Sequence, residues 1–230
     1  MSSTTIRSGE VTRKRRSRLP WMFWLLGILL VIVWWALYQS RLFLIEDLKV
    51  VGTHRLDQAK VSKMANVQIG EPLISVNPGR ISAKLGAIPQ IKFARVERGW
   101  PHSVLITVTE RSPVAVSKSK NGFNLIDDEG MLAGRTNRKP KNMRLVEAKP
   151  NTAAMKSAVQ IAVAIPKKWK VATISAANSN SVIVHLTHGQ SIAFGSGEQA
   201  SLKIKVAGSL IINNYRHINV SAPLNPTVRR

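Results

Sequence analysis

The stretch IKFARVERGWPHSVLITVTER covers residues 91–111 and carries the clearest structural pattern in the chain. In its second half, apolar side chains recur at every second position, namely Val104, Ile106 and Val108. This alternation is typical of a strand with one buried face. Residues 99–102, Gly-Trp-Pro-His, supply a turn between that strand and an earlier one. The stretch therefore predicts two antiparallel strands joined by a short turn.

The residues before this stretch add one strand and two helices. The segment 48–51 is a short apolar strand that Gly52 ends. Asp57 and Asn77 are good N-caps for two helices of suitable apolar spacing, and Pro89 stops the second helix. The predicted order is strand, helix, helix, strand, strand. Two helices packed on a small three-stranded sheet would bury these apolar faces, which makes the region a small α+β domain.

Residues 112–223 indicate a second domain with strands and helices. An Asn-Gly turn at 121–122 predicts a hairpin, and residues 152–165 predict a helix that a proline stops. A second helix is expected in the segment EQASLKIKVAGSLIIN, and the remaining segments have the pattern of short strands. The last expected strand covers 218–222. We therefore expect an antiparallel β domain with packed helices, followed by a disordered C-terminal tail over residues 224–230.

An uncharged segment near the N-terminus predicts a membrane anchor. No charged residue lies between Arg18 and Arg41, and a helix needs about 20 mostly apolar residues to cross a bilayer. Aromatic residues that favour the two membrane faces flank its apolar centre: Trp21, Trp24, Trp34, Trp35 and Tyr38. The segment ends in bulky residues instead of a small-residue cleavage site, which disfavours a removable signal peptide. We predict one transmembrane helix over residues 20–40.

The tail at residues 1–19 sets the orientation of this anchor. It contains one acidic residue, Glu10, and six basic residues: Arg7, Arg13, Lys14, Arg15, Arg16 and Arg18. Basic residues beside a span stay in the cytoplasm and attract anionic lipid. The tail is therefore expected to be cytoplasmic, and the chain after about residue 41 to lie outside the cytoplasm.

The net positive charge of the chain indicates which kinds of molecule it would attract. The formal net charge is +22; the tail contributes six positive charges and one negative charge, or +5, so +17 remains on the rest of the chain. Such a surface would attract anionic lipid headgroups, phosphate-rich wall polymers or acidic proteins. The basic residues are scattered and are not gathered with aromatic residues, which argues against nucleic-acid binding. The chain has no cysteine, so disulfides and thiolate chemistry are excluded.

The residues of 43–111 resemble a POTRA (polypeptide-transport-associated) domain of the kind found in the FtsQ/DivIB family of bacterial cell-division proteins. Its matching positions run in order as Val50, Gly52, Gly70, Pro72, Leu73, Val76, Leu85 and Pro89. The A-x-V-x-R-x-W-P motif follows at Ala94, Val96, Arg98, Trp100 and Pro101, and V-x-E-R-x-P at Val108, Glu110, Arg111 and Pro113. We expect most of these residues to stabilise the fold, with Trp100 and Pro101 filling the hairpin turn. Alternation along the strand predicts that Glu110 and Arg111 point to opposite faces.

This resemblance implies a non-catalytic scaffold at the division septum that links early division proteins to septal peptidoglycan synthesis. It implies FtsB-like and FtsL-like partners, with FtsW and FtsI downstream. In the family, the last strand of the β domain pairs with FtsB, and the matching residues are Ile218, Asn219, Val220, Ser221 and Ala222. An exposed sheet edge can accept a partner segment because its backbone groups are unpaired. Asn219 stands where Asp is common, and residues 221–222 where some relatives have Arg-Tyr, so the usual anchoring side chains are not carried over.

No cofactor, metal or catalytic residue is expected. The turn at 127–130, Asp-Asp-Glu-Gly, lacks the ligand spacing of a calcium loop and is expected to be solvated. His185 and His188 have no nearby acidic partner, and Gly195-Ser196-Gly197 lacks the features of a phosphate-binding loop. Serine and lysine residues are plentiful, but none sits in a recognised nucleophile motif. Two alternatives stay open, namely a POTRA-type chaperone or binding module for exported polypeptides and a membrane-anchored cell-wall hydrolase.

Overall fold

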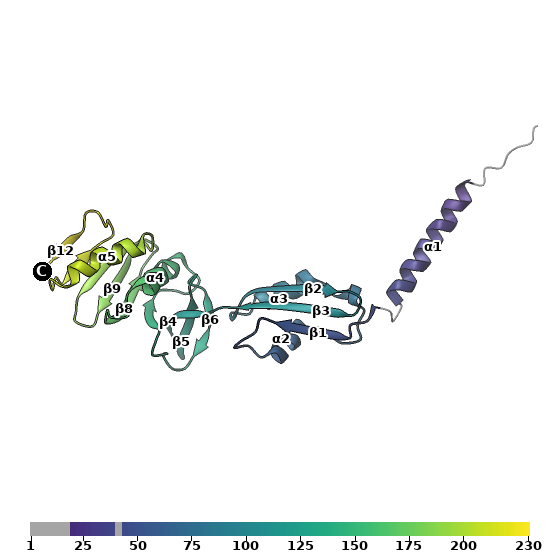
Figure 1. The fold of residues 1–230 in the computed structure, drawn as a ribbon, viewed down its shortest axis with the longest axis horizontal. Coiled ribbons are helices and arrows are strands. Elements are labelled where there is room, and N and C mark those ends of the chain that lie inside the picture. Colours follow the sequence, from purple (N-terminus) through teal and green to yellow (C-terminus); the bar gives the residue numbers. More distant parts are fainter. Residues whose placement is uncertain (1–18, 40–42) are drawn as a thin grey trace, which may run out of the picture.

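The computed structural model describes residues 19–39 and 43–230. Figure 1 shows a helix, α1 (Leu19–Gln39), then a domain with a three-stranded sheet and then a domain with a nine-stranded sheet, following one another along the chain. Each of the two sheet domains has its own cluster of buried apolar side chains. The described part of the chain is therefore mixed α+β, with two independent cores.

Helix α1 is apolar on all sides, and every one of its described side chains, at positions 21–35, is exposed. Within the residues that the structure describes, no helix is both long enough and apolar enough to cross a membrane. The basic tail predicted at 1–19 lies outside the described residues, apart from the first residue of α1. The span predicted at 20–40 stays a prediction.

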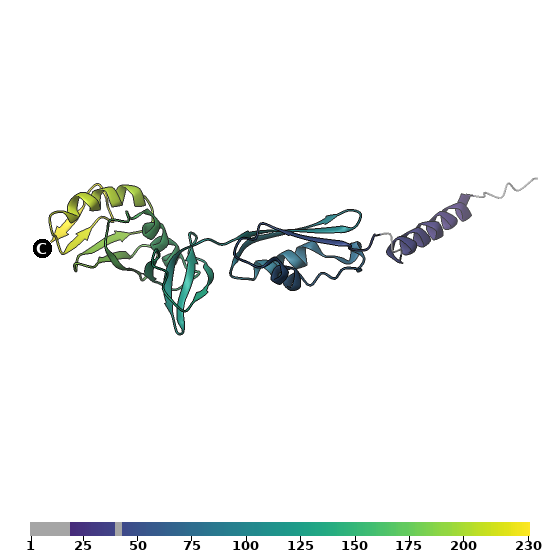
Figure 2. The ribbon, with the colours of Figure 1, turned by 60° about the horizontal axis from the view of Figure 1, so that its bottom comes forward.

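The first sheet domain consists of β1 (Asp47–Val51), α2 (Gln58–Ala65), a short 3-10 helix η2 (Leu73–Ser75), α3 (Pro78–Gly86), β2 (Ile91–Gly99) and β3 (Ser103–Glu110). The strand order is β1-β3-β2, with β1 parallel and β2 antiparallel to the central strand β3. The two helices lie on one side of this sheet (Figure 2). The predicted order of strand, helix, helix, strand, strand is confirmed.

Strand β3 is the centre of this domain, as its alternating sequence predicts. Val104, Ile106 and Val108 are at most 2% exposed, and their neighbours along the strand are partly or fully exposed. Ile106 lies opposite Val50 of β1 and Val96 of β2, so the three strands share one buried row. The helices contribute the other half of this core with Val61, Ala65 and Leu85.

The helix boundaries follow from their capping residues. The side chain of Asp57 accepts a hydrogen bond from the N–H of Ala59 (3.0 Å), and Asn77 accepts one from Arg80 (3.0 Å). These bonds satisfy N–H groups that have no partner within the helix. Helix α3 begins at a proline, which needs no donor there, and ends three residues before Pro89. Both predicted caps are confirmed.

The second domain has nine strands and two helices within the described chain. Its elements are β4 (Pro113–Ser119), β5 (Gly122–Asp127), β6 (Leu132–Thr136), β7 (Arg144–Glu147), α4 (Ala153–Ala164), β8 (Val171–Ala176), β9 (Val182–Leu186), β10 (Ser191–Gly195), α5 (Ala200–Ile211), β11 (His217–Asn219) and β12 (Thr227–Arg229). The strand order across the sheet is β12-β11-β10-β9-β8-β7-β4-β5-β6.

This sheet is mixed, which corrects the expectation of an antiparallel domain. The pairs β4–β7, β7–β8 and β10–β11 are parallel, and the other pairs are antiparallel. Helix α4 connects β7 to β8, and helix α5 connects β10 to β11. Two parallel neighbours need a crossover connection of this kind, because a short turn can only reverse the chain direction.

Both helices pack on the same face of the nine-stranded sheet (Figure 2), with α4 over β7 and β8 in its middle and α5 over β10 and β11, nearer the end that carries β12. The core between helices and strands is rich in fully buried side chains, and the largest are Phe194, Ile126, Met155, Ile161, Ile174, Ile192 and Ile218. No described helix covers the opposite face, the open face of the sheet. The order of the strands thus places β11 and β12 at one end of the molecule and the first sheet domain beyond β6 (Figure 1).

The C-terminal segment differs from its prediction. The sequence predicts a disordered tail over 224–230, but residues 227–229 form β12, which pairs antiparallel with β11. The edge of the sheet is therefore β12, and β11 lies one strand inside it. A strand of three residues between Pro226 and the chain end is too short to show a periodic pattern, so the sequence does not reveal it.

Candidate partner-binding edge and domain junction

Strand β11 presents one face to the core and one to solvent. Ile218 (1% exposed) and Val220 (0%) lie in the core below α5, whereas Asn219 is exposed. The N–H of Val220 donates to the carbonyl of Ala193 in β10 (2.8 Å). Because successive N–H groups point to opposite sides of a strand, the N–H of Asn219 points towards β12. Partner pairing at this edge would use the backbone of Asn219 and of His217, two residues before it.

The chain leaves the sheet directly after Val220. The Oδ1 atom of Asn219 accepts hydrogen bonds from the N–H (3.0 Å) and the hydroxyl (2.7 Å) of Ser221. This local turn competes with further strand pairing. Of the five predicted pairing residues, only Ile218 and Asn219 belong to the strand; Val220, Ser221 and Ala222 follow it. The prediction of a continuous edge strand over 218–222 is therefore wrong.

Strand β12 is held almost entirely by its backbone. Thr227, Val228 and Arg229 pair with Asn219, Ile218 and His217, respectively. All three β12 side chains are exposed, with Val228 at 42%. Among the described residues, no side chain of β12 belongs to the buried cluster of this domain. Since burial of apolar area supplies most folding free energy, β12 is a weakly attached edge.

The open face of the sheet is polar near this edge. A row of cross-strand neighbours runs through Thr173, His185, Ser191, His217 and Arg229. The hydroxyl of Ser191 lies 2.7 Å from Nδ1 of His217. A shallow groove of about 290 Å³ lies over β10, β11 and β12 on this face. A segment added at the edge would therefore lie beside polar side chains that its own side chains could contact.

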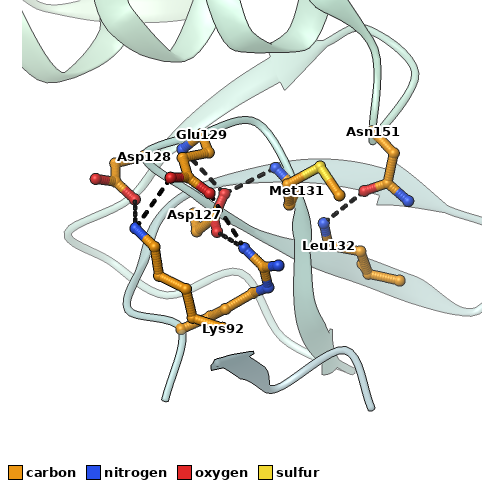
Figure 3. A network of polar contacts seen from close by, with 8 residues as sticks. Lys92, Asp127, Asp128, Glu129, Met131, Leu132 and Asn151 are labelled. Atoms are coloured by element: carbon orange, nitrogen blue, oxygen red, sulfur yellow. Dashed lines mark hydrogen bonds and ion pairs between the residues drawn. The ribbon is translucent and has the colours of Figure 1, made fainter. Parts of the chain in front are cut away.

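A second polar site joins the two sheet domains, and its centre is Asp127 (Figure 3). This carboxylate is fully buried. Its Oδ1 accepts from the N–H groups of Glu129 (3.0 Å) and Met131 (2.7 Å), and its Oδ2 accepts from Nη1 of Arg111 (2.5 Å). The expectation of a solvated turn at 127–130 is therefore wrong for Asp127 and Gly130, which are buried, and holds for Asp128 and Glu129, which are exposed. The prediction missed Asp127 because its charged partner lies 16 residues away in sequence.

Residues of both domains surround this carboxylate. Nζ of Lys92 in β2 lies 3.2 Å from Glu129 and 3.8 Å from Asp128. The bond to Glu129 and the charge of Asp128 raise the pKa of Lys92 above its ordinary value. On the far side, Oδ1 of Asn151 accepts from the N–H of Leu132 (2.8 Å), as Figure 3 shows. Asn151 thus holds the turn, and the cap of α4 is Thr152, whose hydroxyl accepts from Met155 (3.2 Å).

Glu110 and Arg111 have separate partners, as the alternation of faces predicts. The carboxylate of Glu110 accepts hydrogen bonds from the backbone N–H groups of His54 (2.7 Å), Arg55 (3.0 Å) and Leu56 (2.9 Å). Burial alone would raise the pKa of Glu110, but these three donors outweigh it and lower the pKa below its ordinary value. Glu110 therefore fixes the loop between β1 and α2 to the end of β3.

Arg98 and Trp100 have unequal roles. Arg98 donates from Nε to the carbonyl of Val76 (3.0 Å) and from Nη2 to that of Ile74 (3.2 Å), which ties β2 to the segment before α3. Trp100 is 56% exposed and contacts Phe43 edge-on, with ring centroids 5.4 Å apart. The ring does not fill the hairpin turn as expected. Pro101 lies in the turn, where it follows a cis peptide bond.

The glycines and prolines of the motif lie where the backbone conformation favours them. Gly52 has φ +85°, and a Cβ atom there would lie 2.1 Å from the carbonyl oxygen of Val108. Gly70 also has positive φ, +91°, and its N–H donates to Ile45 (2.8 Å). Pro89 follows α3, and Pro113 opens β4 directly after the domain junction. Nothing in these positions requires contact with a partner.

The structure brings together one serine–lysine pair that the sequence does not signal. Lys203 is 3% exposed, and its Nζ lies 3.2 Å from the hydroxyl and 2.9 Å from the carbonyl oxygen of Ser196. Burial lowers the pKa of Lys203. The contact to the carbonyl makes Lys203 an anchor for the turn before α5. Within residues 19–39 and 43–230, no group of three or more His, Cys, Asp and Glu side chains could hold a metal ion.

Comparison with known proteins agrees with the motif residues. Residues 43–111 match the family profile described as POTRA domain, FtsQ-type. The chain is 31% identical over 240 residues to cell division protein FtsQ of Streptomyces coelicolor, covering 94% of this chain and 90% of that protein. It is 31% identical over 235 residues to FtsQ of Streptomyces venezuelae, covering 94% and 87%. FtsQ of Mycobacterium leprae is 29% identical over 199 residues, covering 84% and 58%. The resemblance inferred from sequence motifs is confirmed.

Proposed function

Because the chain belongs to the FtsQ family of cell division proteins, we propose that it is a non-catalytic, membrane-anchored scaffold of the bacterial division machinery. It links early division proteins to septal peptidoglycan synthesis through contacts outside the cytoplasm. FtsB-like and FtsL-like proteins are its direct partners, and FtsW and FtsI act downstream. The protein concentrates at the division septum, where these partners assemble.

The proposed anchor is the apolar segment at 20–40. Exposed apolar side chains on all sides of α1 require a non-aqueous environment or a partner to cover them. The basic tail before it favours an orientation with the N-terminus inside the cell. Residues from about 43 onward then lie outside the cytoplasm, where a chain without cysteine depends on its two cores for stability.

We propose that a partner strand pairs with β11 in place of β12. The observation that carries this proposal is the attachment of β12 by three backbone-paired residues with exposed side chains. Its removal would cost little burial, and it would free the backbone of His217 and Asn219 for a longer segment. The proposed binding residues are then Ile218, Asn219, Val220, Ser221 and Ala222, with the exposed side chains of Asn219 and Ser221 available to the partner. Ile218 and Val220 support the strand from the core.

Removing β12 tests this mode of binding. In cells whose only copy of the protein lacks residues 225–230, we expect recruitment of the FtsB-like protein to stay intact. In detergent solution, we expect the same truncated protein to bind the FtsB-like protein more tightly. The gain arises because the partner no longer has to displace β12. Loss of recruitment by a folded truncation would instead assign binding to β12 itself and would contradict the proposal.

A proline at position 219 tests whether the backbone of β11 pairs with the partner. In the truncated chain, N219P removes an N–H that points away from β10, and it leaves the bond from Val220 to Ala193 in place. We expect binding of the FtsB-like protein to be lost. The control N219A removes the bonds from the side chain to Ser221 but keeps the backbone N–H, and it is expected to bind.

The two alternative functions predict other results. A binding module for exported polypeptides would accept many extended segments at the same edge, so unrelated unfolded polypeptides would compete with the FtsB-like protein at similar concentrations. A cell-wall hydrolase has one structural observation in its favour, the contact between Ser196 and Lys203. It would lose function in a folded S196A variant, and the scaffold would not.

A further inference from the structure

Two loops of the second domain place lysines around one groove. Between β6 and β7, the N–H of Met143 donates to the carbonyl of Pro140 (3.2 Å) and closes a tight turn. Between α4 and β8, the N–H of Trp169 donates to the carbonyl of Pro166 (3.2 Å) and closes a second one. Both loops lie beside the start of β7, so their residues meet across a groove of about 420 Å³.

The groove is basic and has one aromatic side. Its lining includes four exposed lysines, Lys139, Lys141, Lys167 and Lys170, together with the half-buried ring of Trp169. None of the described residues that line it is acidic, and none of the four lysines takes part in an ion pair with a described carboxylate. Four uncompensated ammonium groups around one hollow raise the local concentration of anions.

Buried contacts below the groove hold its two loops in place. The guanidinium of Arg144 donates to the carbonyl of Ala162 and to those of Ile165 (3.0 Å) and Pro166 (3.1 Å) at the end of α4. Burial lowers the pKa of Arg144. Trp169 packs against the core and α5, so its ring cannot turn freely. The lysines are therefore mounted on a rigid base, although their own side chains are mobile in solvent.

We propose that this groove binds an anionic polymer of phosphodiester-linked polyol or sugar units, of the kind found in bacterial cell walls. Lysine ammonium groups bind phosphate as point charges, and several of them along a groove favour a chain with repeated charge. The Trp169 ring offers an apolar wall for the uncharged part of each unit. Figure 1 shows the nine-stranded domain separated from α1 by the first sheet domain, which favours a polymer over lipid headgroups of the anchoring membrane. The location of such a polymer rests on the proposed orientation of the chain, but its binding does not.

The test uses the full chain in nanodiscs of zwitterionic lipid and a soluble poly(glycerol phosphate) as the probe, with binding measured by calorimetry. The groove variant is K139Q/K141Q/K167Q/K170Q. The control variant, K60Q/K120Q/K156Q/K205Q, removes the same charge at four exposed lysines elsewhere. We expect the groove variant to bind at least about tenfold more weakly and to show a smaller dependence of affinity on salt, since fewer counterions are released. We expect the control variant to bind within about threefold of the original chain, because long-range attraction is screened by salt.

Three results would overturn the proposal. Equal weakening in both variants would mean that net charge alone attracts the polymer. Groove-dependent binding of phosphatidylglycerol vesicles without binding of the polymer would assign the site to lipid. Groove-dependent binding of polyglutamate as tight as that of the polymer would assign it to acidic proteins. None of these results depends on the FtsB-like protein, so failure here and failure of the scaffold proposal are distinguishable.

Discussion

Nη1 of Arg111 lies 2.5 Å from Oδ2 of Asp127, and this ion pair joins the end of the first sheet domain to the β5–β6 turn of the second. Asp127 is fully buried and Arg111 is 14% exposed at its side chain. The residue before Arg111, Glu110, binds within its own domain. Two adjacent charged residues thus secure the first domain internally and connect it to the second.

Removing the charge of Asp127 is expected to weaken this junction. D127N leaves Arg111 without a carboxylate partner and should lower the free energy of unfolding of the full chain in detergent by about 2 kcal/mol. It should also speed proteolysis between residues 111 and 113, because the connection between domains loosens. The control D128N changes an exposed carboxylate 3.8 Å from Lys92 and should have little effect. Equal stability of D127N and D128N would contradict the role given to Asp127.

The hydrogen bonds of Glu110 should make the stability of the folded chain depend on pH. The pKa of Glu110 is lowered in the folded chain, so its contribution is fully present above the carboxyl pKa of the unfolded chain and is lost as the pH falls through the lowered folded value. E110Q should reduce the free energy of unfolding by about 1 kcal/mol at neutral pH. The difference from the original chain should shrink on acidification below pH about 4. Denaturant titrations from pH 7 to pH 3 measure this, and a constant difference would argue against the three backbone bonds.

Two glycines of the motif should differ in their tolerance of a side chain. G52A places a Cβ atom against the carbonyl of Val108 and puts an alanine at a positive φ that it rarely adopts, so we expect a loss of about 2 kcal/mol or more. G70A has the same φ problem but open space around the new atom, and we expect about 1 kcal/mol. Thermal unfolding of the two variants gives the comparison. A G70A variant less stable than G52A would contradict this account of the close approach between β1 and β3.

Arg144 should stabilise the end of α4. R144M keeps a long side chain but removes the charged donor for three carbonyl groups, and we expect a loss of about 2 kcal/mol in the free energy of unfolding. R135M, at an exposed position of β6, is the matched control and should be close to neutral. Hydrogen exchange of the last turn of α4 locates the effect. Unchanged protection there would show that Arg144 does not hold the carbonyl groups.

Much of the first domain could be predicted because its signals are local. The alternation of Val104, Ile106 and Val108 fixes a strand, and Asp57 and Asn77 mark helix starts within a few residues of the N–H groups that they bind. The motif residues also predicted the family. Each of these inferences needs only neighbours in sequence or a known pattern.

The features that the sequence did not predict depend on contacts between distant segments. The bond between Arg111 and Asp127 spans 16 residues, and that between Arg144 and Ala162 spans 18. Parallel pairing of β7 with β8, and of β10 with β11, depends on where helices return the chain. The position of β12 changed the candidate site most, because a three-residue strand has no pattern of its own and is defined only by its pairing with β11.

Site-specific crosslinking can detect whether a division partner pairs with β11. The chain has no cysteine, so a single H217C or K156C substitution gives one attachment point for a photoreactive probe. His217 is exposed in β11, and Lys156 is exposed on α4, which covers the other face of the sheet. In dividing cells, we expect a crosslink to the FtsB-like protein from position 217 and not from position 156. A crosslink from position 156 alone, or from neither position in cells that still divide, would contradict pairing with β11.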